Sequence, residues 1–121
     1  YGGDIDPKII FFDQGIKTYH VDQTSGASIY KMFEKIGDVK FDVIIDDGLH
    51  TPEAANTFLL NAVHRLKDGG IYIVEDCHRD YEQTFLSMME NWRNYFSFVA
   101  MLNIYPHHQN PYDNRLIICI K

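Results

Sequence analysis

Two pairs of acidic residues with a histidine close by are the side chains in this sequence best suited to chemistry. Asp46 and Asp47 precede His50, and Glu75 and Asp76 form the second pair. Adjacent carboxylates repel one another unless a cation or hydrogen-bond donors compensate their charge. Carboxylate oxygens are the ligands that Mg²⁺ and Ca²⁺ prefer, and a nearby histidine can take a proton from a substrate hydroxyl. The two pairs therefore favour a site that combines a hard metal ion with a general base.

Each acidic pair directly follows a run rich in β-branched residues. Residues 41–45 read Phe-Asp-Val-Ile-Ile, and residues 71–74 read Ile-Tyr-Ile-Val. Continuous apolar runs of this kind are typical of parallel strands that are buried on both faces. The carboxyl ends of such strands share one edge of the sheet, which is where open α/β sheets bind their ligands. We therefore expect both acidic pairs to lie on one edge of a sheet.

Simpler structural roles compete with these assignments. Asp46 could cap local backbone amides, and His50 could be a surface residue before a helix. For either acid alone the two interpretations are equally good, but the repetition of the pattern after the next strand favours the functional one. His78 follows the second pair and is equally consistent with a solvated position.

The elements that must position these residues alternate between strands and helices. Thr51-Pro52-Glu53 is typical of a helix start, with a hydroxyl cap and a proline in the first turn. The apolar positions that follow predict that this helix continues to Gly69-Gly70. Two further helices are predicted, one that ends at Gly37 and one that carries Trp92 on its apolar face. The predicted strands cover residues 1–6, 17–22, 41–45, 71–74, 98–104 and 116–120.

This alternation predicts right-handed crossovers and a single α/β domain over residues 1–121 with a mostly parallel sheet. No helix is predicted between the last two strands, so we expect them to be antiparallel neighbours.

Composition narrows the class of partner. The net charge of −6 and the absence of a basic stripe argue against a nucleic acid. No window approaches the length of a membrane span, and no signal sequence begins the chain. Cys77 and Cys119 have no spacing typical of a disulfide framework. We therefore expect a cytoplasmic protein with two reduced thiols, and we expect Cys77 to be unreactive.

Further candidates lie at the ends of the first strands and in one loop. Asp4 ends the first strand, where an acid commonly accepts hydrogen bonds from a nucleoside ribose, although it could also cap the strand end. Asp22 and Gln23 end the second strand, where they could contact an adenine edge or start a turn. His107-His108 falls in a predicted loop that could be a substrate lid or an ordinary polar hairpin.

Four segments, taken together, resemble the class I S-adenosylmethionine-dependent methyltransferases. They are Gly-Gly-Asp-Ile-Asp at residue 2, His-Val-Asp-Gln at residue 20, Phe-Asp-Val-Ile-Ile-Asp-Asp-Gly-Leu-His at residue 41 and Gly-Gly-Ile-Tyr-Ile-Val-Glu-Asp at residue 69. The similarity is closest to the metal-dependent O-methyltransferases of macrolide and sugar tailoring, which have Asp-Asp-Gly-Ser-His where this chain has Leu49 in place of the serine.

The resemblance implies a Rossmann-like methyltransferase sheet and a role for each candidate residue. Asp4 would hold the ribose of S-adenosylmethionine, and Asp22 and Gln23 would face the adenine, with Asp46 also on the cofactor side. Asp47 and Asp76, with Glu75 beside them, would bind Mg²⁺. His50 would be the base that removes the proton of a small-molecule hydroxyl as the methyl group is transferred.

The resemblance also implies an N-terminally truncated domain. The family's first strand and its glycine-rich turn would precede Gly2, and that strand lies at the centre of the family's sheet. Without it, the strand that ends at Asp4 and the strand before Asp46 have exposed edges. We expect these edges to favour rearrangement, direct pairing, or association with another chain such as a second copy. An alternative function is therefore a non-catalytic α/β interaction module that has lost cofactor binding.

Overall fold

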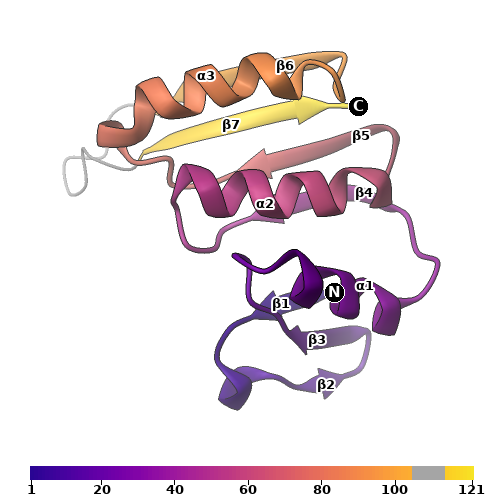
Figure 1. Cartoon of the computed structure of the whole chain (residues 1–121). Helices are drawn as coiled ribbons and strands as arrows, with labels where there is room; N and C mark the ends of the chain where they lie inside the picture. Colours follow the sequence, from indigo (N-terminus) through magenta and orange to yellow (C-terminus); the bar gives the residue numbers. More distant parts are fainter. Residues whose placement is uncertain (105–113) are drawn as a thin grey trace.

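Two separate β-sheets with three α-helices along one side make up the structure, a computed structural model that describes residues 1–104 and 114–121 (Figure 1). Ser25 and Thr51 cap α1 and α2 by accepting hydrogen bonds from the backbone N–H groups of Ser28 and Ala54, and the cap at Thr51 confirms the predicted helix start. The elements, in chain order, are β1 (Gly2–Asp4), η1 (Pro7–Ile9), β2 (Phe12–Asp13), β3 (Ile16–His20), α1 (Gly26–Ile36), β4 (Phe41–Asp46), α2 (Pro52–Ala62), η2 (Val63–Arg65), β5 (Leu66–Val74), η3 (Arg79–Tyr81), α3 (Glu82–Trp92), β6 (Phe98–Asn103) and β7 (Arg115–Ile120).

The smaller sheet has the strand order β1-β3-β2. β1 pairs with β3 in parallel, with Asp4 opposite His20, and β2 pairs with β3 antiparallel. The sequence analysis did not predict β2, which is only two residues long. Its turn back to β3 contains Gly15 at a φ of 80°, a conformation that glycine adopts without steric cost.

The larger sheet has the strand order β4-β5-β7-β6. β4 and β5 are parallel, and Asp46 lies opposite Val74 at their carboxyl ends. β6 and β7 are antiparallel neighbours, with Val99 opposite Cys119, so the prediction for the last two strands is confirmed. The parallel pairing of β4 with β5 brings both acidic pairs to the same edge, as expected.

The predicted end of the second helix is wrong. α2 stops at Ala62, and after one short turn β5 begins at Leu66 rather than at Ile71. Leu66 is fully buried and pairs with Phe41, so its apolar side chain contributes to the core from a strand and not from a helix. Gly69, with a φ of 76°, lies within this strand and coincides with a shift of register against β4.

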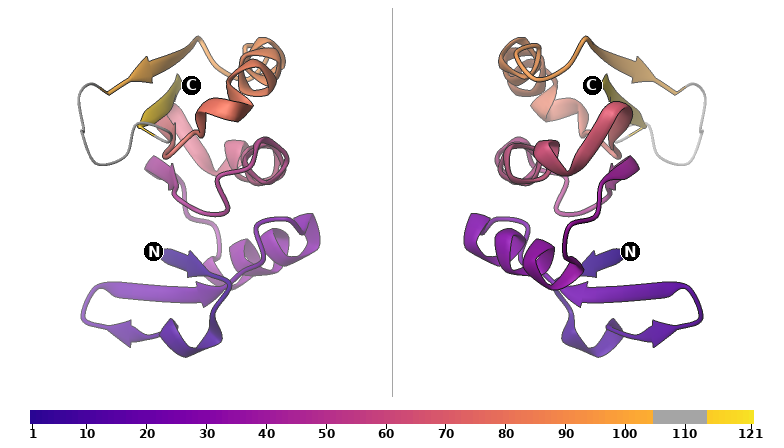
Figure 2. Two further views of the ribbon diagram at one scale, coloured as in Figure 1. Left: turned by 90° about the vertical axis from the view of Figure 1, so that its left-hand side faces the viewer. Right: turned by 90° about the vertical axis from the view of Figure 1, so that its right-hand side faces the viewer.

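All three α-helices lie on the same side of the sheets (Figure 2). The core fills the space between them, and its largest fully buried side chains include Trp92, Tyr72 and Phe85. On the opposite face, no helix among the described residues covers β4, and Val43 and Ile45 are 46% and 54% exposed. The prediction that this strand is buried on both faces is therefore wrong for the described part of the chain.

β1 and β4 face one another across an open space and do not pair, since they belong to different sheets. Of the three outcomes expected for these edges, direct pairing is therefore wrong, and association with another chain stays a prediction. On the helix side, α1 and α2 connect the two sheets, and the ring centroids of Phe33 in α1 and Phe58 in α2 are 6.5 Å apart. No helix within the described residues is long and apolar enough to cross a membrane.

Candidate functional site

Asp47, His50 and Asp76 form a cluster at the carboxyl ends of β4 and β5. One ligand atom from each side chain lies within 4.8 Å of the others, close enough for all three to contact a single metal ion. His50 Nε2 is 3.2 Å from Asp47 Oδ1. The Asp47 side chain is 60% exposed and that of His50 is 35% exposed, so a ligand can reach the cluster from solvent.

Two members of this cluster have unusual backbone conformations. His50 and Asp76 have φ values of 58° and 49°, in the left-handed region that non-glycine residues seldom adopt. Asp and His enter this region more readily than most residues, but the conformation still has an energetic cost. They are the only non-glycine residues with positive φ among those described, and both lie in the cluster. Such concentration of backbone strain is typical of functional sites.

Glu75 and His78 were also candidates, and the structure places both outside the cluster. The Glu75 backbone N–H donates to the Asp46 carbonyl at 2.9 Å and so continues the pairing of β5 with β4. Of the second acidic pair, only Asp76 offers a ligand atom within 4.8 Å of those of Asp47 and His50. The His78 ring lies 3.7 Å from the carboxylate of Asp80 in the next turn.

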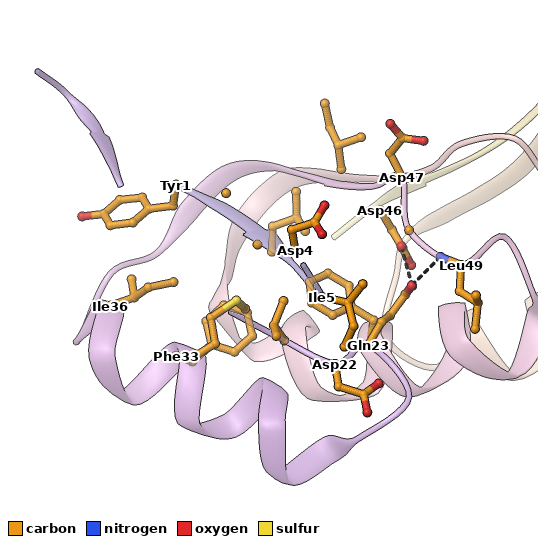
Figure 3. A pocket seen from close by; sticks show the side chains of 18 of the residues that line it. Tyr1, Asp4, Ile5, Asp22, Gln23, Phe33, Ile36, Asp46, Asp47 and Leu49 are labelled. Atoms are coloured by element: carbon orange, nitrogen blue, oxygen red, sulfur yellow. Dashed lines mark hydrogen bonds between the residues drawn. The ribbon is translucent and has the colours of Figure 1, made fainter. Parts of the chain in front are cut away.

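Asp46 is almost fully buried, and its side chain points away from Asp47 (Figure 3). Its Oδ1 accepts a hydrogen bond of 2.5 Å from Gln23 Nε2, and its Oδ2 accepts one of 3.2 Å from the Tyr72 hydroxyl. Burial raises the pKa of Asp46 to about 6, although these hydrogen bonds favour the charged form. The sequence analysis missed Tyr72. The signal was the strand alternation, which puts Ile44, Asp46, Tyr72 and Val74 on the same face.

Gln23 connects the two sheets. Besides its bond to Asp46, its Oε1 accepts a hydrogen bond of 2.8 Å from the Leu49 backbone N–H (Figure 3). Asp22 forms a local turn, in which its Oδ1 accepts hydrogen bonds from the backbone N–H and the hydroxyl of Thr24. Both bonds lower the pKa of the Asp22 carboxyl, and the bond from the Thr24 hydroxyl has the larger effect.

A cavity of about 860 Å³ lies between the facing edges of β1 and β4. Asp4, Asp22, Gln23, Asp46 and Asp47 all contribute to its lining, so four residues assigned to the cofactor and one assigned to the metal share one space (Figure 3). Asp4 Oδ1 accepts a hydrogen bond of 2.7 Å from the Asp6 backbone N–H, which corresponds to the strand-end role considered above. The remaining lining is largely apolar and includes the following side chains: Val21, Met32, Phe33, Ile36, Phe41, Val43, Ile44, Ile45 and Phe58.

Among the described residues, Cys77, Cys119 and Trp92 do not line this cavity. Both cysteines are buried and free, and burial raises the pKa of each thiol to about 12, in agreement with the prediction that Cys77 is unreactive. Trp92 is 1% exposed and belongs to the core. His107 and His108 lie outside the described residues.

No family profile matches the sequence. Two curated proteins are similar to it. The chain is 34% identical over 85 residues to 8-demethyl-8-alpha-L-rhamnosyl tetracenomycin-C 2'-O-methyltransferase of Streptomyces olivaceus, which aligns 70% of this chain with 22% of that protein. It is 32% identical over 81 residues to demethylmacrocin O-methyltransferase of Streptomyces fradiae, with 67% and 20% covered. The chain thus spans about a fifth of the length of these relatives.

Solved structures share the fold. The MycE methyltransferase from the mycinamycin biosynthetic pathway, in complex with Mg, SAH and mycinamycin VI, superposes with a TM-score of 0.64 at 19% identity. The match covers 99% of this chain and 36% of that one. A putative rRNA methylase from Clostridium thermocellum superposes with a TM-score of 0.53 at 16% identity, over 87% of this chain and 57% of the other. The chain therefore has the fold of Rossmann-like methyltransferases.

Proposed function

Because this chain is a relative of the class I S-adenosylmethionine-dependent methyltransferases in sequence and fold, we propose that it contributes the metal-binding and proton-accepting residues of an O-methyltransferase active site. The observation that carries the proposal is the cluster of Asp47, His50 and Asp76 beside the cavity. Both curated relatives are named O-methyltransferases, which supports a hydroxyl on a small molecule as the methyl acceptor.

Asp47 and Asp76 fit a Mg²⁺ ion by the chemistry of their donor atoms. Mg²⁺ prefers oxygen ligands and is usually bound by one or two carboxylates while it retains several waters. Two carboxylates within 4.8 Å of each other need a positive charge or donors to offset their repulsion. Mg²⁺, when bound, would orient a substrate hydroxyl and lower its pKa. Glu75 lies outside the cluster, so it would not be a ligand and would only add negative charge near the metal site.

His50 is the proposed general base. Asp47 Oδ1 lies 3.2 Å from His50 Nε2 and can hold the imidazole in one orientation. In the reaction the substrate oxygen forms a bond to the methyl carbon of the sulfonium, the bond from that carbon to sulfur breaks, and sulfur keeps the electron pair as a neutral thioether. The hydroxyl proton passes to His50.

The nucleoside of the cofactor would lie along the ends of β1 and β3. Asp4 ends β1 and Asp22 follows β3, and both line the cavity, where their carboxylates can accept hydrogen bonds from ribose hydroxyls and an adenine amino group. Asp46 is engaged with Tyr72 and Gln23, so its part in cofactor binding would be to support the cavity wall.

The test is a titration of the chain with Mn²⁺, a paramagnetic substitute for Mg²⁺, with and without S-adenosylhomocysteine. We expect Asp47→Asn and Asp76→Asn each to lose most of the Mn²⁺ affinity. Asp38→Asn is the matched control, because Asp38 is an exposed carboxylate outside the cluster. If both cluster variants bind Mn²⁺ as the unaltered chain does, the metal assignment is wrong. Metal binding without any binding of the nucleoside would favour a different metal-dependent enzyme.

A further inference from the structure

The side chain of Gln23 occupies the junction between the two sheets. It comes from the loop after β3, but both of its hydrogen-bond partners belong to the other sheet and the loop that follows it. Its Nε2 donates to Asp46 Oδ1 at 2.5 Å, and its Oε1 accepts from the Leu49 N–H at 2.8 Å (Figure 3). The amide thus contacts the residue before Asp47 and the residue before His50.

Gly48 provides the space for this amide. A Cβ atom at residue 48 would stand only 2.8 Å from Gln23 Cδ and still closer to its oxygen, which is nearer than real Cβ atoms approach other atoms. Gly48 does not have a positive φ, so its backbone would accept alanine. The need for glycine here therefore comes from the close approach of Gln23 and not from the turn itself.

The partners of Gln23 are themselves held in place. Asp46 is 5% exposed, and its second oxygen accepts a hydrogen bond from Tyr72, which is fully buried. A rigid chain of hydrogen bonds therefore runs from Tyr72 in the core through Asp46 and Gln23 to the Leu49 backbone. The segment between its two attachment points contains Asp47, and His50 follows directly after it.

We infer that Gln23 is a positioning residue, whose amide holds the loop of residues 46–49 so that Asp47 and His50 meet Asp76 at the metal cluster. The inference rests on the proposed function. It replaces direct contact with adenine as the main role of Gln23, because one N–H and one lone pair of the amide are already in use within the protein. The same amide joins the loop beside the cofactor cavity to the loop that carries the metal ligands.

The test compares the dissociation constant for Mn²⁺ among Gln23→Ala, Gly48→Ala, the double variant and the unaltered chain. Residues that support metal ligands typically change metal affinity by about 10- to 100-fold when they are replaced. We expect each single variant to weaken Mn²⁺ binding at least ~10-fold. Since Gly48→Ala acts by displacing Gln23, the double variant should bind no more weakly than either single variant, whereas independent effects would multiply.

Gln14→Ala is the control, because Gln14 is an exposed glutamine in the turn between β2 and β3. Hydrogen exchange of the Leu49 amide gives a second measurement, and we expect it to accelerate in both single variants without a matching loss of global stability. Unchanged Mn²⁺ affinity in Gln23→Ala would overturn the inference, as would multiplied effects in the double variant. If the unaltered chain itself does not bind Mn²⁺, the proposed function fails. If the unaltered chain binds Mn²⁺ and Gln23→Ala binds it equally well, only the inference about Gln23 fails, so the two failures are distinguishable.

Discussion

The hydroxyl of Tyr72 lies 3.2 Å from Oδ2 of Asp46 and connects the centre of β5 to the end of β4. Both residues are buried, with Tyr72 at 0% and Asp46 at 5% exposure. Burial raises the pKa of the Tyr72 phenol well above its usual value, and the adjacent Asp46 adds to this, so the phenol keeps its proton and remains a donor. A carboxyl group at the edge of the core thus depends on a donor that comes from the core itself.

Replacing this donor should destabilise the protein. Tyr72→Phe leaves Asp46 with one hydrogen bond fewer in a buried position, which costs about 1–3 kcal/mol of unfolding free energy. Chemical denaturation followed by circular dichroism measures the change. Tyr95→Phe is the control, because Tyr95 is 47% exposed. Equal stability of the two variants would show that the Tyr72 hydrogen bond contributes nothing.

The backbone strain at Asp76 predicts a difference between two substitutions that remove the same carboxylate. Alanine at a φ of 49° is strained, whereas glycine is not, so Asp76→Gly should be more stable than Asp76→Ala by about 1 kcal/mol. Both variants should lose Mn²⁺ binding equally. The same pair at Asp38, which does not have a positive φ, should show no advantage for glycine. An alanine variant as stable as the glycine variant would argue against strain at residue 76.

The proposed role of His50 predicts a separation between metal binding and proton transfer. If His50 is the base, His50→Ala should raise the Mn²⁺ dissociation constant much less than Asp47→Ala does, because it would remove only a partner of a metal ligand. In a protein that contains this chain and transfers methyl groups, His50→Ala should also remove the rise of rate with pH that reports the loss of a proton from the base. A large loss of Mn²⁺ affinity in His50→Ala would instead identify His50 as a metal ligand.

Burial of the thiols predicts that the stability of the protein depends on pH. Burial raises the pKa of Cys119 to about 12, so the folded protein holds the thiol form where the unfolded chain already forms thiolate. Its contribution to stability is therefore complete below the unfolded pKa of about 8.5 and is lost as pH rises towards about 12. Near pH 8, a thiol reagent such as Ellman's reagent should label Cys119 only after denaturant is added. Rapid labelling of the native protein would contradict its burial.

Local signals in the sequence determined the elements that carry the cluster of Asp47, His50 and Asp76. The strand before Asp46, the helix start at Thr51-Pro52 and the antiparallel pairing of β6 with β7 were each predicted from a few neighbouring residues, and all three predictions are confirmed. Short-range patterns of this kind act through backbone conformation and side-chain alternation, which residues next to one another in the chain control. They were also sufficient to bring both acidic pairs to one edge of the sheet.

Other features were decided only by the tertiary structure, namely which face of an element is buried and which distant residue a side chain contacts. Leu66 fits the apolar stripe of a helix but packs in β5, because its pairing with Phe41 and its burial outweigh a local periodicity. Gln23 has no local signal for its two bonds, since its partners lie 23 and 26 residues away and meet it only when the sheets come together. The separation of β1 from β4, and the exposure of Val43, likewise depend on which segments are present to pair with an edge or cover a face, which a pattern within one strand does not encode.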